Sequence, residues 1–138
     1  MTALFADTFY WIALADLTDS AHWRALDITA QRATSGIVTT EEVLTEYLAF
    51  FSTAPRFRRV AAAEGVEGLL SNSVVRVIPQ SRESFLSGLQ LYRARPDKGY
   101  SLADCISMNT MRREGLTEVL TNDRHFEQEG FHTLFRDF

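Results

Sequence analysis

The chain has 138 residues, of which 46% are hydrophobic and 23% charged, and it contains a single cysteine. This composition is typical of one globular domain and excludes a disordered chain, while one cysteine excludes an intramolecular disulfide framework and agrees with a reducing cytoplasm. The formal net charge of -4 argues against binding nucleic acid by bulk charge alone, and no run of apolar residues is long enough to predict a membrane span.

The N-terminal segment predicts a strand followed by a short helix. Residues 4–6 form a short apolar run that ends at Asp7, which is typical of a buried strand. Thr8 is expected to cap a helix over residues 9–15. No basic segment precedes the apolar run and an acid interrupts it early, so we expect no signal peptide.

Two helices with a strand between them are predicted next. Residues 21–32 predict a helix, because apolar side chains recur at helical spacing at Trp23, Leu26 and Ala30. Residues 37–39 predict a short strand. Thr40 is followed by two acids, which is typical of a capped helix start, and the helix after it has an apolar face made of Val43, Leu44, Tyr47, Leu48 and Phe51.

The second half of the chain continues this alternation. Further helices are predicted over residues 55–70, 81–92 and 101–114, and further strands over residues 74–78, 118–121 and 131–135. Strands that alternate with helices imply a parallel sheet covered on both faces. The predicted fold class is therefore α/β, a three-layer α/β/α arrangement with a central, mostly parallel sheet. No linker-like stretch divides the chain, so we expect one domain over residues 1–138.

Four acids stand where this fold predicts a functional site. Asp7 and Asp123 follow predicted strands, and ligands bind at the carboxyl ends of the strands in such sheets. Glu46 and Asp104 lie on predicted helices among apolar neighbours. Gathered carboxylates repel one another unless a divalent cation neutralises them, and ligands made of oxygen alone favour Mg²⁺ or Mn²⁺. Such an ion assists phosphodiester cleavage. Taken singly, each acid is more often a helix cap or a solvated helix position.

The sequence resembles the PIN-domain family, and within it the VapC-like toxins. The segments that carry the resemblance are Ala6-Asp7-Thr8, the stretch Val38 to Glu46, the stretch Asp97 to Cys105, and Leu120-Thr121-Asn122-Asp123-Arg124-His125-Phe126. They are similar to the family's Asp-Thr start, its strand, turn and acid-bearing helix, its Ser-Leu-x-Asp element and its Thr-x-Asp-x-x-Phe ending. The resemblance implies that the catalytic and metal-binding acids are Asp7, Glu46, Asp104 and Asp123.

The resemblance also implies an activity, binding partners and a location. It implies a metal-dependent endoribonuclease that cuts RNA, a cognate antitoxin, a homodimer and a cytoplasmic location. Asp97 is a supporting candidate outside the central set. Glu42 competes with Glu46, because the two are one helical turn apart and both can face the same side. Glu46 is preferred because its Val-Leu-Thr-Glu context is closer to the family's pattern.

Two other interpretations remain open from the sequence. A non-catalytic or receiver-like regulatory module is disfavoured because Ala6, rather than a second acid, precedes Asp7 and no lysine follows Lys98. A phosphatase with an Asp-x-Asp-x-Thr motif is disfavoured because Phe9 occupies the place of the second acid. The histidines show no metal-ligand spacing and are interpreted as surface or packing residues: His22, His125 and His132.

Overall fold

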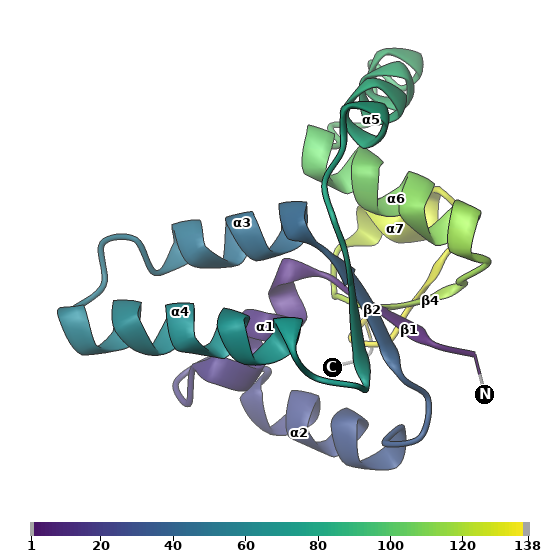
Figure 1. The fold of residues 1–138 in the computed structure, drawn as a ribbon. Coiled ribbons are helices and arrows are strands. Elements are labelled where there is room, and N and C mark those ends of the chain that lie inside the picture. Colours follow the sequence, from purple (N-terminus) through teal and green to yellow (C-terminus); the bar gives the residue numbers. More distant parts are fainter. Residues whose placement is uncertain (1, 137–138) are drawn as a thin grey trace.

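A computed structural model describes residues 2–136, in which five parallel strands form one sheet (Figure 1). The strands are β1 (Leu4–Ala6), β2 (Ile37–Thr40), β3 (Val75–Ile78), β4 (Glu118–Leu120) and β5 (His132–Thr133). The helices are α1 (Thr8–Ala15), α2 (His22–Gln31), α3 (Glu41–Phe50), α4 (Arg56–Leu70), α5 (Arg82–Ala94), α6 (Leu102–Glu114) and α7 (Arg124–Gln128). The predicted α/β class with a parallel central sheet is confirmed.

The strand order β3-β2-β1-β4-β5 places the first strand at the centre of the sheet. The chain moves outward from β1 to β3 and then crosses to β4 on the other side. Because parallel connections are right-handed, the two halves of the chain place their helices on opposite faces. Figure 1 shows α1 and α2 on one side of the sheet and α6 and α7 on the other. Flavodoxin-like receivers use the order 2-1-3-4-5 instead, so the order found here argues against the receiver-like interpretation.

The central strands are buried on both faces, which explains their continuous apolar sequence. Phe5, Ala6, Val119 and Leu120 are fully buried in β1 and β4. Parallel strands covered by helices on both sides need apolar side chains in both directions. The register of Ala6 against Leu120 brings the ends of β1 and β4 together at one edge of the sheet. Asp7 and Asp123 lie at this edge, in the segments that follow the two strands.

The predicted apolar face of α2 is wrong. Trp23 is 73% exposed and Leu26 is 40% exposed, whereas His22 and Ala25 are buried. Ile28 is buried with them, and Nδ1 of His22 lies 2.7 Å from the carbonyl oxygen of Ala13 on α1. The buried side of α2 is therefore the one that carries His22, Ala25 and Ile28.

Three local expectations also differ from the structure. Asp7, rather than Thr8, is the residue that precedes α1, and Thr8 is the first helical residue. The strand expected over residues 131–135 is shortened to His132–Thr133. After it the chain bends, although the backbone N–H of Phe135 still donates to the carbonyl of Thr121. The short helix α7 was not predicted.

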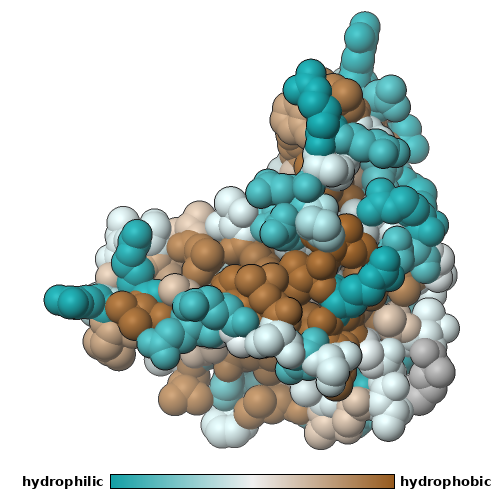
Figure 2. Space-filling model, in the orientation of Figure 1, coloured by the Kyte–Doolittle hydropathy of each residue, from teal (hydrophilic) through white to brown (hydrophobic). Residues whose placement is uncertain are grey.

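Hydrophobic side chains also gather on the outer surface. Figure 2 shows them over α3 and α4 and on α5. The large exposed apolar residues there include Phe50, Phe57 and Val60 and, on α5, Phe85, Leu86 and Leu89. Exposed apolar patches of this kind mark sites of protein contact. Within residues 2–136, no helix is both long and apolar enough to cross a membrane.

Candidate active site at the carboxyl edge of the sheet

Asp7 and Asp123 are joined through the hydroxyl of Thr121. Thr121 Oγ1 donates to Asp7 Oδ2 at 2.9 Å and accepts from the backbone N–H of Asp123 at 3.2 Å. Thr121 follows β4 directly and is fully buried. The Asp123 carboxylate also accepts from the backbone N–H of His125 at 2.9 Å and so caps α7. Neighbouring strands therefore deliver both acids to one edge, as the sequence predicted.

Glu46 comes to the same place from α3. Thr40 caps this helix by accepting from the backbone N–H of Val43, as predicted. Thr8 Oγ1 then donates to Glu46 Oε1 at 2.8 Å, which ties α3 to the residue after Asp7. The competing acid Glu42 accepts from the hydroxyl of Ser84 on α5 at 3.0 Å. The two acids thus have different partners, and Glu46 is the one beside Asp7.

Asp104 reaches the cluster from the first turn of α6. Ser101 accepts from the backbone N–H of Asp104, and the Asp104 carboxylate accepts from the backbone N–H of Ser101, both at 3.0 Å. This reciprocal capping box fixes the carboxylate at the helix start. The charge of Asp104 acts on both Asp7 and Glu46. The capping role and a place in the acidic cluster are therefore compatible.

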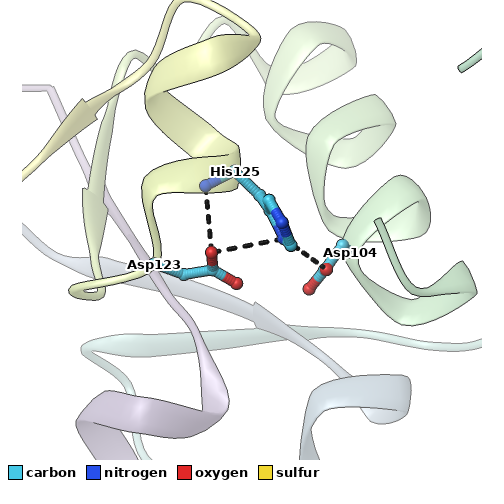
Figure 3. A group of neighbouring side chains, drawn as sticks. All are labelled: Asp104, Asp123 and His125. Carbon is cyan, nitrogen blue, oxygen red and sulfur yellow. Dashed lines mark hydrogen bonds and ion pairs between the residues drawn. The ribbon is translucent and has the colours of Figure 1, made fainter. Parts of the chain in front are cut away.

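His125 is a residue of this site that the sequence analysis missed. Its Nδ1 lies 3.3 Å from Asp123 Oδ1 and 3.6 Å from Asp104 Oδ2 (Figure 3). The sequence offered one signal, which is the position of a histidine two residues after an aspartate that caps a helix. The second carboxylate, Asp104, comes from a distant part of the chain, so local ligand spacing did not reveal it.

The electrostatics of the site favour a proton or a cation. Burial raises the pKa of Asp7 to about 7, against the lowering effect of the Thr121 hydrogen bond, and the charges of Asp104 and Glu46 raise it further. Burial also raises the pKa of Asp104, and the charge of Asp123 adds to this effect. Glu46 lies at the exposed rim, where partial desolvation of its carboxylate and the charge of Asp104 raise its pKa.

The donors fit a divalent cation. Single ligand atoms of Asp104, Asp123 and His125 all lie within 4.8 Å of one another. Nδ1 of His125 is buried and makes no hydrogen bond within residues 2–136, although buried polar groups normally have a partner. Carboxylate oxygens are the ligands that Mg²⁺ and Mn²⁺ prefer.

The remaining candidate, Asp97, is exposed on the loop before α6, where its charge acts on Arg95.

Comparison with known proteins agrees with this geometry. The family model described as the PIN domain matches residues 4–131. The chain belongs to the PIN-domain family. The expected family is therefore confirmed.

Individual relatives of this PIN domain carry informative names. The 23S rRNA-specific endonuclease VapC20 of Mycobacterium tuberculosis is 25% identical over 128 residues, which cover 93% of this chain and 95% of that protein. The crystal structure of VapC20, described as a Sarcin-Ricin loop cleaving toxin, has a TM-score of 0.82 at 25% identity and covers 94% of this chain and 96% of that chain. FitAcB from Neisseria gonorrhoeae has a TM-score of 0.67 at 13% identity, over 94% of this chain and 95% of that chain, and shows likeness of fold.

Proposed function

We propose that this PIN-domain chain is a divalent-metal-dependent endoribonuclease and the toxin of a toxin–antitoxin pair, with residues 1–138 acting as one domain. The observation that carries the proposal is the convergence of acids from four separate segments at one edge of the sheet: Asp7, Glu46, Asp104 and Asp123. The name of its relative VapC20, an endonuclease specific for 23S rRNA, supports this class of activity.

The proposed cofactor is Mg²⁺ or Mn²⁺, held by these carboxylates. These residues would hold the cation, which would supply an activated water and would neutralise the charge that develops on the cleaved phosphate. Thr121 orients Asp7 by its hydrogen bond, and Thr8 orients Glu46 in the same way. The backbone N–H groups of Ser101 and His125 hold Asp104 and Asp123. Each acid is therefore positioned by a neighbour before any ligand arrives.

The proposed substrate is RNA, and the first probe is a fragment of 23S rRNA that contains the sarcin–ricin loop. A relative of 25% identity is described as cleaving that loop. The rim of the site is open to solvent at Glu46 and, in part, at Asp123, so a phosphate on a large RNA can reach it. A substrate of this kind and a single buried thiol, Cys105, both agree with the cytoplasm.

The proposed protein partners are a cognate antitoxin and a second copy of the chain. The apolar side chains on α4 and on α5 support this, because they are too exposed to belong to the core of one subunit. Light scattering after size-exclusion chromatography, with and without the protein of the neighbouring gene, measures both associations. A strictly monomeric chain would contradict the homodimer.

The nuclease proposal is tested with two isosteric variants, Asp7→Asn and Asp104→Asn. Each amide keeps an oxygen that accepts the hydrogen bond from Thr121 or from the backbone of Ser101, so the fold is retained. Cleavage of the RNA fragment should fall at least about a hundredfold in both, because charge on a metal ligand is worth several kcal/mol in the transition state. Asp27→Asn, on the exposed face of α2, is the matched control and should cleave normally.

Two outcomes would contradict the nuclease proposal. One is cleavage that persists in both site variants at the wild-type rate. The other is wild-type protein that binds Mn²⁺ but cuts no RNA, whether the sarcin–ricin fragment or total cellular RNA. Addition of a chelator to the wild-type reaction should stop cleavage, and excess Mg²⁺ or Mn²⁺ should restore it.

A further inference from the structure

His125 presents a buried nitrogen to two carboxylates. Nδ1 lies 3.3 Å from Asp123 Oδ1 and 3.6 Å from Asp104 Oδ2, between residues from two different elements (Figure 3). Within the described residues this nitrogen is buried and makes no hydrogen bond. A buried polar atom without a hydrogen bond costs free energy, and a cation held by the two neighbouring carboxylates would give this nitrogen a partner.

We propose that Nδ1 of His125 is a direct ligand of the divalent cation, beside Asp104 and Asp123. This inference rests on the proposed metal-dependent function and names a residue that an all-carboxylate site does not include. The three ligand atoms all lie within 4.8 Å of one another. Neighbouring ligands of an octahedral ion with bonds of about 2.1 Å are about 3 Å apart. Nδ1 already lies 3.3 Å from Asp123 Oδ1 and 3.6 Å from Asp104 Oδ2, so these two separations are close to the spacing of neighbouring ligands.

The surroundings of the ring determine which nitrogen faces the acids. The ring of Tyr100 packs edge-on against that of His125, with centroids 5.2 Å apart. The Nε2 side faces Gly99, where an added Cβ would lie 3.8 Å from Nε2. The backbone N–H of His125 is held by Asp123. Nδ1 is thus directed at the carboxylates, and a neutral imidazole that coordinates through Nδ1 carries its proton on Nε2.

A nitrogen ligand changes which cation the site prefers. Mg²⁺ binds oxygen donors and keeps much of its water, whereas imidazole favours transition-metal ions. With His125 as a ligand, the site binds Mn²⁺ in preference to Mg²⁺. The alternative is that the ring is a fixed neighbour of the two acids that never touches the metal, and the experiment below separates the two.

The test is pulsed electron paramagnetic resonance of the full-length protein with Mn²⁺ at less than one equivalent. Coupling of the electron spin to a directly bound nitrogen is expected in the wild type. When the histidines are labelled with ¹⁵N, the ¹⁴N coupling should be replaced by a ¹⁵N coupling. This measurement needs no mutation. It should be lost in His125→Ala and in His125→Gln, with the fold checked by circular dichroism. The control is His132→Ala, since His132 on β5 is 71% exposed.

Calorimetry provides the second readout. His125→Ala should weaken Mn²⁺ binding by about tenfold or more, and Mg²⁺ binding by clearly less. Bound Mn²⁺ without histidine coupling, coupling that persists in His125→Ala, or an equal loss for both cations overturns the inference and leaves the carboxylate site standing. Failure of the wild type to bind Mn²⁺ at all contradicts the proposed function itself.

Discussion

The hydroxyl of Thr121 donates a hydrogen bond to Oδ2 of Asp7 at 2.9 Å, although the two residues are 114 positions apart in the chain. The same oxygen accepts from the backbone N–H of Asp123. One buried side chain therefore sets the position of two acids that arrive on neighbouring strands. It also stabilises the charged form of Asp7, whose pKa is otherwise raised by burial.

Replacement of this hydroxyl should weaken metal binding. Thr121→Val keeps the shape of the side chain but removes the hydrogen bond that lowers the pKa of Asp7. The loss of one such bond is worth about 1 kcal/mol, so the dissociation constant for Mn²⁺ at pH 7.5 should rise roughly fivefold. Thr121→Ser should restore it. Titration calorimetry measures the change, and a valine variant that binds as tightly as the wild type would show that Thr121 has no role in orienting Asp7.

The buried carboxyl of Asp7 predicts a pH-dependent stability in the metal-free protein. Its pKa is about 7 in the folded state and 3.8 in its ordinary state. Between these pH values the folded chain holds a proton that the unfolded chain has released, so the free energy of unfolding falls as the pH rises from 4 to 7. The loss is limited to ~4 kcal/mol.

Asp7→Asn removes this titration and is therefore expected to stabilise the metal-free protein at pH 8 much more than at pH 5. Thermal unfolding in the presence of a chelator, at both pH values, provides the comparison. The exposed carboxylate of Asp27 serves as the control, since Asp27→Asn should shift the melting temperature little at either pH. An equal gain at pH 5 and pH 8 for Asp7→Asn would argue against a raised pKa.

The sequence predicted well what local chemistry determines. The cap at Thr40 depends on residues within one helical turn, and it was predicted. The placement of Asp7 and Asp123 at one edge follows from the polarity of parallel strands. The buried face of α2 was misassigned because Ala21, Ala25 and Ile28 also recur at helical spacing, and the larger Trp23 and Leu26 were chosen in their place.

The position of His125 was also beyond local reasoning. Its nearness to Asp123 is set by two residues of sequence, but its nearness to Asp104 depends on how α6 and α7 lie against each other (Figure 3). Such a contact between separate elements appears in no local motif. The choice between Glu42 and Glu46 also depended on contacts between separate elements. Glu46 faces α1 and Glu42 faces α5, and local sequence does not determine this.

A second buried acid should have the opposite dependence on pH. Burial alone raises the pKa of Glu129, but hydrogen bonds from Arg95, Arg112 and Tyr100 hold it at about 2. Stabilisation from a depressed pKa is present above the ordinary value of 4.5 and is lost as the pH falls from 4.5 to about 2. The two arginine side chains are partly exposed, so solvent screens the pairs.

Glu129→Gln is accordingly expected to lower the free energy of unfolding by about 2 kcal/mol at pH 7 and by little near pH 2. Urea unfolding at the two pH values measures this difference. Glu64→Gln, on the exposed surface of α4, provides the control and should change stability by less than about 0.5 kcal/mol. A loss that is the same at both pH values would mean that the carboxylate charge contributes nothing.

The helices α5 and α6 approach each other closely at Gly88, and a substitution there tests this contact. A Cβ at this position would lie 2.5 Å from Cγ1 of Ile106 on α6, which is closer than such atoms approach. Ile106 is β-branched and its χ1 is restricted in a helix, so Cγ1 cannot easily move aside. Gly88→Ala should therefore push the helices apart and destabilise the protein by about 1–2 kcal/mol, despite the better helix propensity of alanine.

The matched control is Gly65→Ala in α4, where an added Cβ meets nothing within 4 Å. Because nothing clashes there, the only effect is that alanine lowers the conformational entropy of the unfolded chain. The variant should therefore be about 0.5–1 kcal/mol more stable than the wild type. The double variant Gly88→Ala/Ile106→Ala should show a favourable coupling, because removal of Cγ1 relieves the contact. If Gly88→Ala stabilised the chain as Gly65→Ala does, α5 would not pack against α6 at this distance.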